Sequence, residues 1–173
     1  MPGVPFEMKA MLTNFVIPQI KKRFKLPTII HKNILTAGIG ESFLADKIKS
    51  WEDNLPKHIK LAYLPSLGIV KLRLTTEGND KQKLNKEISL QIRKLEKIIS
   101  EYIFGVDEDT LESVVGNTLK KKKATIYTAE SCTGGYIAHL LTSVAGSSDY
   151  YKGSVIAYSN EIKISKLNVR SKT

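Results

Sequence analysis

The feature that most constrains the fold is a long amphipathic helix predicted between Asp80 and Tyr102. Its apolar residues recur every three or four positions, at Leu84, Ile88, Ile92, Leu95 and Ile99. The preceding Gly78-Asn79-Asp80 provides a helix-cap signal. An apolar stripe of this length needs a surface to cover it, and such a stripe usually packs on a sheet of its own chain.

The segments before that helix supply such a sheet. Residues 59–63 and 70–74 alternate apolar and polar side chains with the period of two expected for half-buried strands. Pro65–Gly68 between them predicts a hairpin turn. A further strand and helix are expected from β-branched residues at 28–36 and from the pattern between Glu41 and Trp51. We therefore predict an α+β domain over residues 27–106, with two helices on one face of the sheet.

A different pattern begins after the acidic, turn-rich segment Gly105–Asp109. Helices and strands are expected to alternate there: a helix at 110–122, a strand at 125–129, a helix opening at Thr133-Gly134-Gly135, and a strand at 154–158. This alternation predicts a parallel α/β layer within a second domain over residues 107–173.

The first 26 residues form a separate helical segment. Pro5 suits the first position of a helix, and Pro18 is expected to end or kink it. The helix has an apolar face, formed by Phe6, Met11, Leu12 and Phe15, and no partner upstream. We expect from this that the chain starts inside a larger domain.

Composition narrows the classes of function. Cys132 is the single cysteine, which excludes an internal disulfide framework and a cysteine-based zinc site. The net charge of +10 would suit a polyanionic partner, although dispersed lysines are more often a solvated surface. No apolar run approaches the roughly 20 residues needed to cross a bilayer. We expect a cytoplasmic protein with no membrane association.

The candidate chemistry lies at the predicted strand ends of the second domain. Thr128–Gly135 places hydroxyls and glycines where open α/β sheets bind ligands, and the first-turn amides of the following helix could hold a phosphate or an oxyanion. Tyr158 and Lys163 follow the next strand and could reach the same rim. In such a set Ser131 would be the nucleophile, Lys163 its base, and Tyr158 would orient the lysine or protonate the leaving ammonia.

Other interpretations of these residues stay open. Thr128–Gly135 also fits a plain helix cap, and a lysine such as Lys163 in a first helical turn is more often solvated. Cys132 could be the nucleophile, because a thiol at a helix start can have a lowered pKa. Glu130 and Glu161 resemble a carboxylate pair, but each is better explained as support at a helix end.

These motifs resemble the C-terminal domain of the competence/damage-inducible protein CinA family. The resemblance rests on Thr128–Gly135, Ala145–Ser148 and Tyr158–Lys163 in this order. It implies a nicotinamide-mononucleotide amidohydrolase, which converts the carboxamide to the acid and releases ammonia without a cofactor. It also implies catalytic roles for Ser131, Lys163 and Tyr158, and substrate binding around Cys132, Thr133, Gly134 and Gly135.

The resemblance extends to the rest of the chain. Gly38–Ser42 and Leu61–Ser66 are similar to the KH-type middle domain of the family. Pro2–Met8 resembles the end of its molybdopterin-binding-like domain, so residues 1–26 would be a remnant of that domain. The family's ADP-ribose pyrophosphatase activity, with any divalent metal, would belong to that domain. Because the remainder of the deamidase domain is also missing, we expect a fragment without deamidase turnover.

Two further functions compete with the amidase. Nucleic-acid binding by the KH-type domain is not expected, because KH modules use a G-x-x-G loop and Gly38-Ile39-Gly40 has the wrong spacing. The middle domain would otherwise be a purely structural module, and homo-oligomerisation is compatible with the family.

Overall fold

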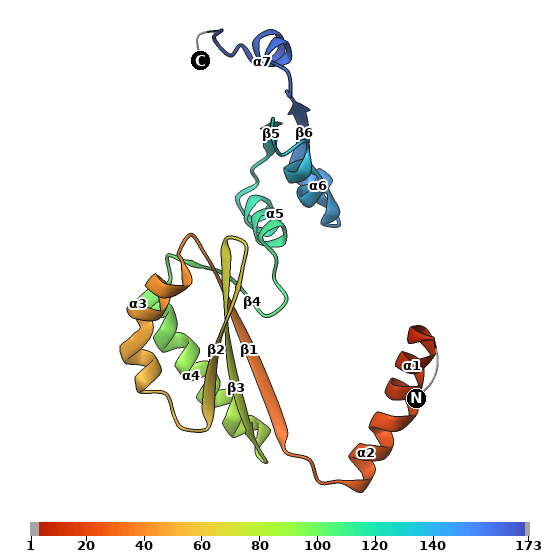
Figure 1. Cartoon of the computed structure of the whole chain (residues 1–173), viewed down its shortest axis with the longest axis vertical. Coiled ribbons are helices and arrows are strands. Elements are labelled where there is room, and N and C mark those ends of the chain that lie inside the picture. The colour runs from red at the N-terminus through yellow and green to blue at the C-terminus, as the bar shows by residue number, and fades with distance from the viewer. Residues whose placement is uncertain (1–3, 172–173) are drawn as a thin grey trace.

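The N-terminal segment is a helix that contains a π-helical turn. The computed structural model describes residues 4–171, and the segment comprises α1 (Pro5–Met11), η1 (Leu12–Val16) and α2 (Ile17–Arg23) (Figure 1). Pro5 lies in the first turn of α1, as predicted. The helix does not end at Pro18 but continues to Arg23, and the π turn ends at Val16, two residues before the proline. The wider π turn accommodates the missing amide and the bulk of the proline ring.

The middle domain has the element order β-α-β-β-α-β. Its elements are β1 (Thr28–Ala37), α3 (Glu41–Asp53), β2 (Ile59–Ser66), β3 (Ile69–Gly78), α4 (Lys81–Ile99) and β4 (Ile103–Val106). The sheet has the strand order β2-β3-β1-β4, and every neighbouring pair is antiparallel. This is the split β-α-β arrangement, in which each crossover skips one strand.

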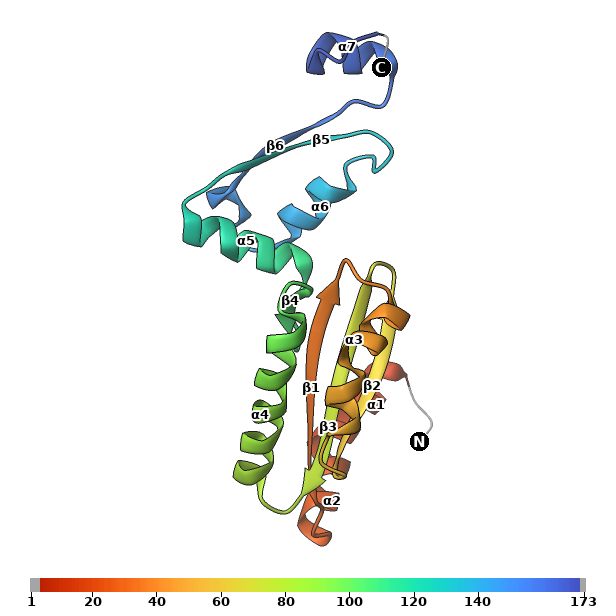
Figure 2. The ribbon, with the colours of Figure 1, turned by 90° about the vertical axis from the view of Figure 1, so that its left-hand side faces the viewer.

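The core of this domain lies between the sheet and its two helices. Figure 2 shows α3 and α4 on the same face of the sheet. Leu72 and Leu74 of β3, Leu44 of α3, and Ile88 and Leu95 of α4 are fully buried there. Along β3, every second residue is buried, as the alternating pattern predicted. The predicted α+β domain with two helices on one sheet face is therefore confirmed.

The structure adds one strand that the sequence pattern did not predict. Gly105 was assigned to a turn-rich joint, but it lies in β4 and pairs with Leu35 of β1. The pairing of β1 with β4 contains a bulge, because Leu35 pairs with Gly105 whereas Thr36 pairs with Ile103. A side chain at position 105 would also collide with Asp109, whose Cβ lies 2.7 Å from the place of a Cβ on Gly105.

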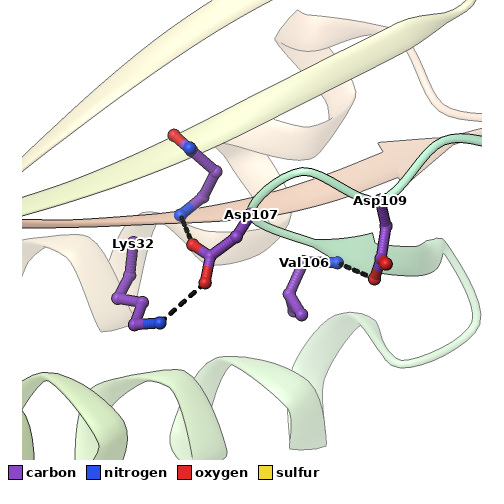
Figure 3. A network of polar contacts seen from close by, with 5 residues as sticks. Lys32, Val106, Asp107 and Asp109 are labelled. Atoms are coloured by element: carbon purple, nitrogen blue, oxygen red, sulfur yellow. Dashed lines mark hydrogen bonds and ion pairs between the residues drawn. The ribbon is translucent and has the colours of Figure 1, made fainter.

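A polar network fixes the chain where it leaves β4 (Figure 3). Asp107 has a positive φ of 51°, and its carboxylate accepts the amide of Asn33 at 3.1 Å and the ammonium of Lys32 at 2.6 Å. The Asp107 amide in turn donates to the Asn33 carbonyl at 2.9 Å. Burial would raise the pKa of Asp107, but the hydrogen bonds from Lys32 and Asn33 outweigh it and lower the pKa.

The C-terminal part contains a parallel strand pair. Its elements are α5 (Leu111–Lys122), β5 (Ile126–Glu130), α6 (Tyr136–Ser143), η2 (Ser147–Asp149), β6 (Tyr151–Ile156) and α7 (Asn160–Leu167). Strands β5 and β6 are parallel, which confirms the predicted parallel layer. Strand β6 begins three residues before the predicted start at Ser154. Figure 2 shows α5 and α6 on one side of the strand pair and α7 on the other.

Candidate functional site

The carboxyl ends of β5 and β6 lie side by side. The amide of Ala157 donates to the carbonyl of Glu130 at 2.7 Å, directly after both strands end. Ser131 begins the segment that leaves β5, and Tyr158 lies in the segment that leaves β6. The two segments that carry the predicted catalytic residues therefore start from neighbouring points, at the end of the strands where parallel sheets bind ligands.

The segment after β5 is a tight turn rather than the start of a helix. Gly134 and Gly135 have positive φ values of 59° and 95°, which favour glycine. A Cβ on Gly135 would lie 2.8 Å from the terminal Cδ1 of Ile156, so the turn approaches β6 closely there. Helix α6 begins at Tyr136, three residues after the predicted opening at Thr133. Ser131 is half-buried in this turn, and Cys132 and Thr133 are exposed.

Glu130 is buried beneath this turn. Only 3% of its surface is exposed, and its carboxylate accepts hydrogen bonds from the amides of Ile137 at 3.0 Å and Ala138 at 2.8 Å. Burial would raise the pKa of Glu130, but these two hydrogen bonds and weaker ones from hydroxyl groups outweigh it and lower the pKa. Glu130 therefore carries its charge at the N-terminus of α6, which confirms its predicted role as support at a helix end.

This arrangement changes the prediction for the helix amides. The first-turn amides of a helix opening at Thr133 were expected to be open to a phosphate or an oxyanion, but the helix begins at Tyr136 and its first-turn amides at Ile137 and Ala138 donate to Glu130. Gly134, predicted to bind substrate through its amide, donates that amide to the carbonyl of Ser131 at 3.0 Å. Within residues 4–171, no hydrogen bond is made by the amides of Cys132, Thr133 and Gly135. The backbone donors open to a ligand thus lie in the turn and not in the helix.

Two hydroxyl groups complete the surroundings of Glu130; Thr128 belongs to the motif identified in the sequence, whereas Ser154 was not recognised there. The hydroxyls of Ser154 and Thr128 lie 3.3 Å and 3.4 Å from its carboxylate. Thr128 pairs with Ser154 across the two strands. The signal was present, because residues two apart on β5 point to the same face of a sheet. The pairing of β5 with β6 that brings in Ser154 is not visible in either strand alone.

Tyr158 and Lys163 lie beyond the end of β6. Tyr158 is 75% exposed. Lys163 is half-buried in the first turn of α7, which the hydroxyl of Ser159 caps by accepting the amide of Ile162 at 3.2 Å. Among the described residues, no hydrogen bond joins Ser131 to Tyr158 or Lys163. The shared pocket for these three side chains stays a prediction.

Lys163 lines a hollow of about 400 Å³ that does not include Ser131. Its other lining residues are Asn160, Ile164, Val169, Arg170 and Ser171. A wider hollow of about 780 Å³ lies in the middle domain, against Phe43 and Tyr102, and contains none of the predicted site residues. The residues predicted for catalysis thus lie around adjacent strand ends, and the hollow lined by Lys163 contains neither Ser131 nor Tyr158.

The structure also describes the surroundings of Cys132 and Glu161, the other two candidates for a catalytic role. Cys132 is exposed in the turn, and Glu161 is exposed in the first turn of α7. Over residues 4–171, no group of three or more His, Cys, Asp or Glu side chains is arranged to hold a metal ion. In the same part of the chain, none of the helices has the length and apolar character required to cross a bilayer.

Comparison with known proteins gives two family matches. Residues 31–105 match the damage-inducible protein CinA KH domain, and residues 108–173 match the CinA C-terminal domain. The CinA-like protein of Flavobacterium psychrophilum is 57% identical over 170 residues, which are 98% of this chain and 41% of the relative. The CinA-like protein of Cytophaga hutchinsonii is 54% identical over 169 residues, which are 98% of this chain and 40% of that relative.

Among solved structures, the competence damage-inducible protein A of Klebsiella pneumoniae is 36% identical over 36% of this chain and 39% of its own, with a TM-score of 0.36. No conclusion rests on that structural likeness. The chain spans about two fifths of the length of the curated relatives named above. With matches to its KH and C-terminal domains over most of its length, the chain belongs to the CinA family.

Proposed function

We propose that the turn after β5 and the segment after β6 form part of the active site of an amidohydrolase. Its substrate would be nicotinamide mononucleotide, whose carboxamide is hydrolysed to the acid with release of ammonia. The observation that carries the proposal is the hydrogen bond between Ala157 and Glu130, because it places the segments of Ser131 and Tyr158 next to each other. Membership of the CinA family supports the same reaction.

The groups at this site match the needs of amide hydrolysis. The Ser131 hydroxyl attacks the carboxamide carbon as its proton passes to the amine of Lys163. The open amides of Cys132 and Thr133 are suited to stabilise the negative charge that develops on the carboxamide oxygen. Ammonia then leaves with a proton from Tyr158 or Lys163, and water hydrolyses the resulting ester at Ser131.

The proposed reaction also requires the amine of Lys163 to approach the hydroxyl of Ser131. Lys163 can deprotonate Ser131 only at hydrogen-bond distance, and no such bond is present among the described residues. The chain spans about two fifths of the length of its curated relatives, and we expect it by itself to release no measurable ammonia from nicotinamide mononucleotide.

A chimera tests the proposal. In it, this chain replaces the matching 41% of the Flavobacterium psychrophilum relative, and ammonia release from nicotinamide mononucleotide is measured. We expect turnover that falls at least about a thousandfold in Ser131→Ala and in Lys163→Ala. Cys132→Ala is the matched control, since it changes the adjacent residue, and it should retain most activity.

Two results would contradict this assignment. Full turnover by Ser131→Ala would remove the proposed nucleophile. An inactive Cys132→Ala together with an active Ser131→Ala would transfer the nucleophilic role to the thiol. Turnover by the isolated chain that disappears in Ser131→Ala would refute only the expectation that the 173-residue chain is inactive by itself.

A further inference from the structure

Glu130 connects all three elements that surround the predicted nucleophile. Its backbone carbonyl accepts the amide of Ala157 after β6, and its side chain accepts the amides of Ile137 and Ala138 in α6. The hydroxyl of Ser154 on β6 adds a further donor to the same carboxylate. A single residue of β5 is thus bonded through both its main chain and its side chain.

The turn from Ser131 to Gly135 is closed by these bonds. The turn begins directly after the backbone of Glu130, and at its far end the amide of Ile137 donates to the side chain of Glu130. The two ends of the turn are therefore held by one residue. The direction of the Ser131 hydroxyl, and of the open amides of Cys132 and Thr133, depends on this closure.

We propose that Glu130 is the positioning residue of the amidase site, holding the turn in the one conformation that presents Ser131 and the open amides to the substrate. The inference rests on the proposed function only in taking Ser131 as the nucleophile. Because the carboxylate occupies the N-terminus of α6, the phosphate of the substrate is excluded from that end of the helix. Other groups have to bind the phosphate.

The chemistry of the surrounding donors requires a carboxylate at this position. The two oxygens of Glu130 accept from two amides and from hydroxyl groups, and a carboxylate has only acceptors to offer. In Glu130→Gln, the side-chain amide nitrogen is a donor and would face one of the donors that now bond to the carboxylate. A buried donor is left without a partner, and the closure of the turn weakens.

The first test needs no catalytic activity. Amide hydrogen exchange of Ile137 and Ala138 is measured by NMR in the 173-residue chain and in Glu130→Gln. We expect exchange about tenfold faster at these two amides in the variant. Glu112→Gln, a glutamate in the first turn of α5, is the matched control and should leave both rates unchanged. Unchanged exchange in Glu130→Gln would overturn the proposal, whatever the chain hydrolyses.

The second test is kinetic and uses the chimera. Glu130→Gln should lower kcat by about tenfold to a hundredfold, with a smaller rise in KM, because loosening the turn displaces both Ser131 and the open amides that stabilise the charge of the transition state. Glu112→Gln, the control of the first test, should leave kcat unchanged. An equal fall in kcat in both variants, or a rise in KM with normal kcat in Glu130→Gln, would overturn the positioning role.

One outcome separates this inference from the proposed function, and a second variant covers a failure to fold. A parent chimera without ammonia release, together with faster exchange in Glu130→Gln, would reject the amidase and keep the closure of the turn by Glu130. If Glu130→Gln does not fold, Glu130→Asp replaces it, because aspartate keeps the charge and is one methylene shorter. Exchange in Glu130→Asp as slow as in the parent chain would then overturn the proposal.

Discussion

Gly116 is a helical glycine whose replacement by alanine is predicted to destabilise the protein. It lies in the interior of α5, where alanine normally stabilises a helix by about 1 kcal/mol relative to glycine. At this position, however, a Cβ would lie 2.6 Å from the hydroxyl oxygen and 2.8 Å from Cζ of Tyr150. Tyr150 is fully buried, so its ring has little room to withdraw.

The expected magnitude follows from these distances. To restore an ordinary contact of about 3.4 Å, the ring of Tyr150 would have to move by about 0.8 Å. Overpacking of this kind typically costs about 1–3 kcal/mol, which exceeds the gain in helix propensity. After the gain of about 1 kcal/mol in helix propensity is subtracted, we expect Gly116→Ala to lower the free energy of unfolding by up to about 2 kcal/mol.

Urea denaturation followed by circular dichroism measures this change. Asn117→Ala is the matched control, because Asn117 is the next residue of the same helix and is exposed, so this variant should be slightly more stable than the parent chain. Combining Gly116→Ala with Tyr150→Phe removes the closest atom and should recover part of the loss. Gly116→Ala with a stability equal to that of Asn117→Ala would refute the reasoning.

Three other substitutions test the middle domain. Asp80→Ala should lower the free energy of unfolding by about 1 kcal/mol in urea denaturation, because Asp80 caps α4 by accepting two amides; no change would contradict the cap. Leu72→Ala should lower it by about 2–5 kcal/mol, since Leu72 is fully buried, and a loss below 1 kcal/mol would place it outside the core. Asp107→Asn should cost about 1 kcal/mol at pH 7. Because folding lowers the pKa of Asp107, the stability contributed by its carboxylate is present above the ordinary value of 3.8 and is lost as pH falls through the folded pKa. The stabilities of the parent chain and Asp107→Asn should therefore converge in acid. A stability difference that persists at low pH would contradict the ion pair with Lys32.

Long periodic elements were predictable from the sequence. The apolar stripe of α4 and the alternation along β2 and β3 record burial directly, so these elements appear where expected. The four residues of β4 carry too little pattern to be recognised. Their pairing depends on β1, which lies almost seventy residues earlier in the chain. Contacts of this kind leave no local signal.

The candidate site was predictable in composition but not in geometry. The order of Ser131, Tyr158 and Lys163 was visible in the sequence, as was the need for glycine at Gly134 and Gly135. The hydrogen bonds from the α6 amides to Glu130 were not predictable, because that requires knowing that the helix begins at Tyr136 rather than at Thr133. A shift of three residues in the start of α6 decides which backbone amides are free to bind a ligand.

The bulge between β1 and β4 has a consequence for the direction in which the chain continues. Only Glu108, Asp109 and Thr110 separate the anchored Asp107 from the first residue of α5, and Asp109 is itself bonded to the amide of Val106. A connection this short allows little change in the position of α5 relative to the end of β4. Deleting the extra residue at Phe104 would reverse the faces of the residues that follow it, Asp107 included, and would remove the anchor to Lys32 and Asn33 from which the chain continues to α5.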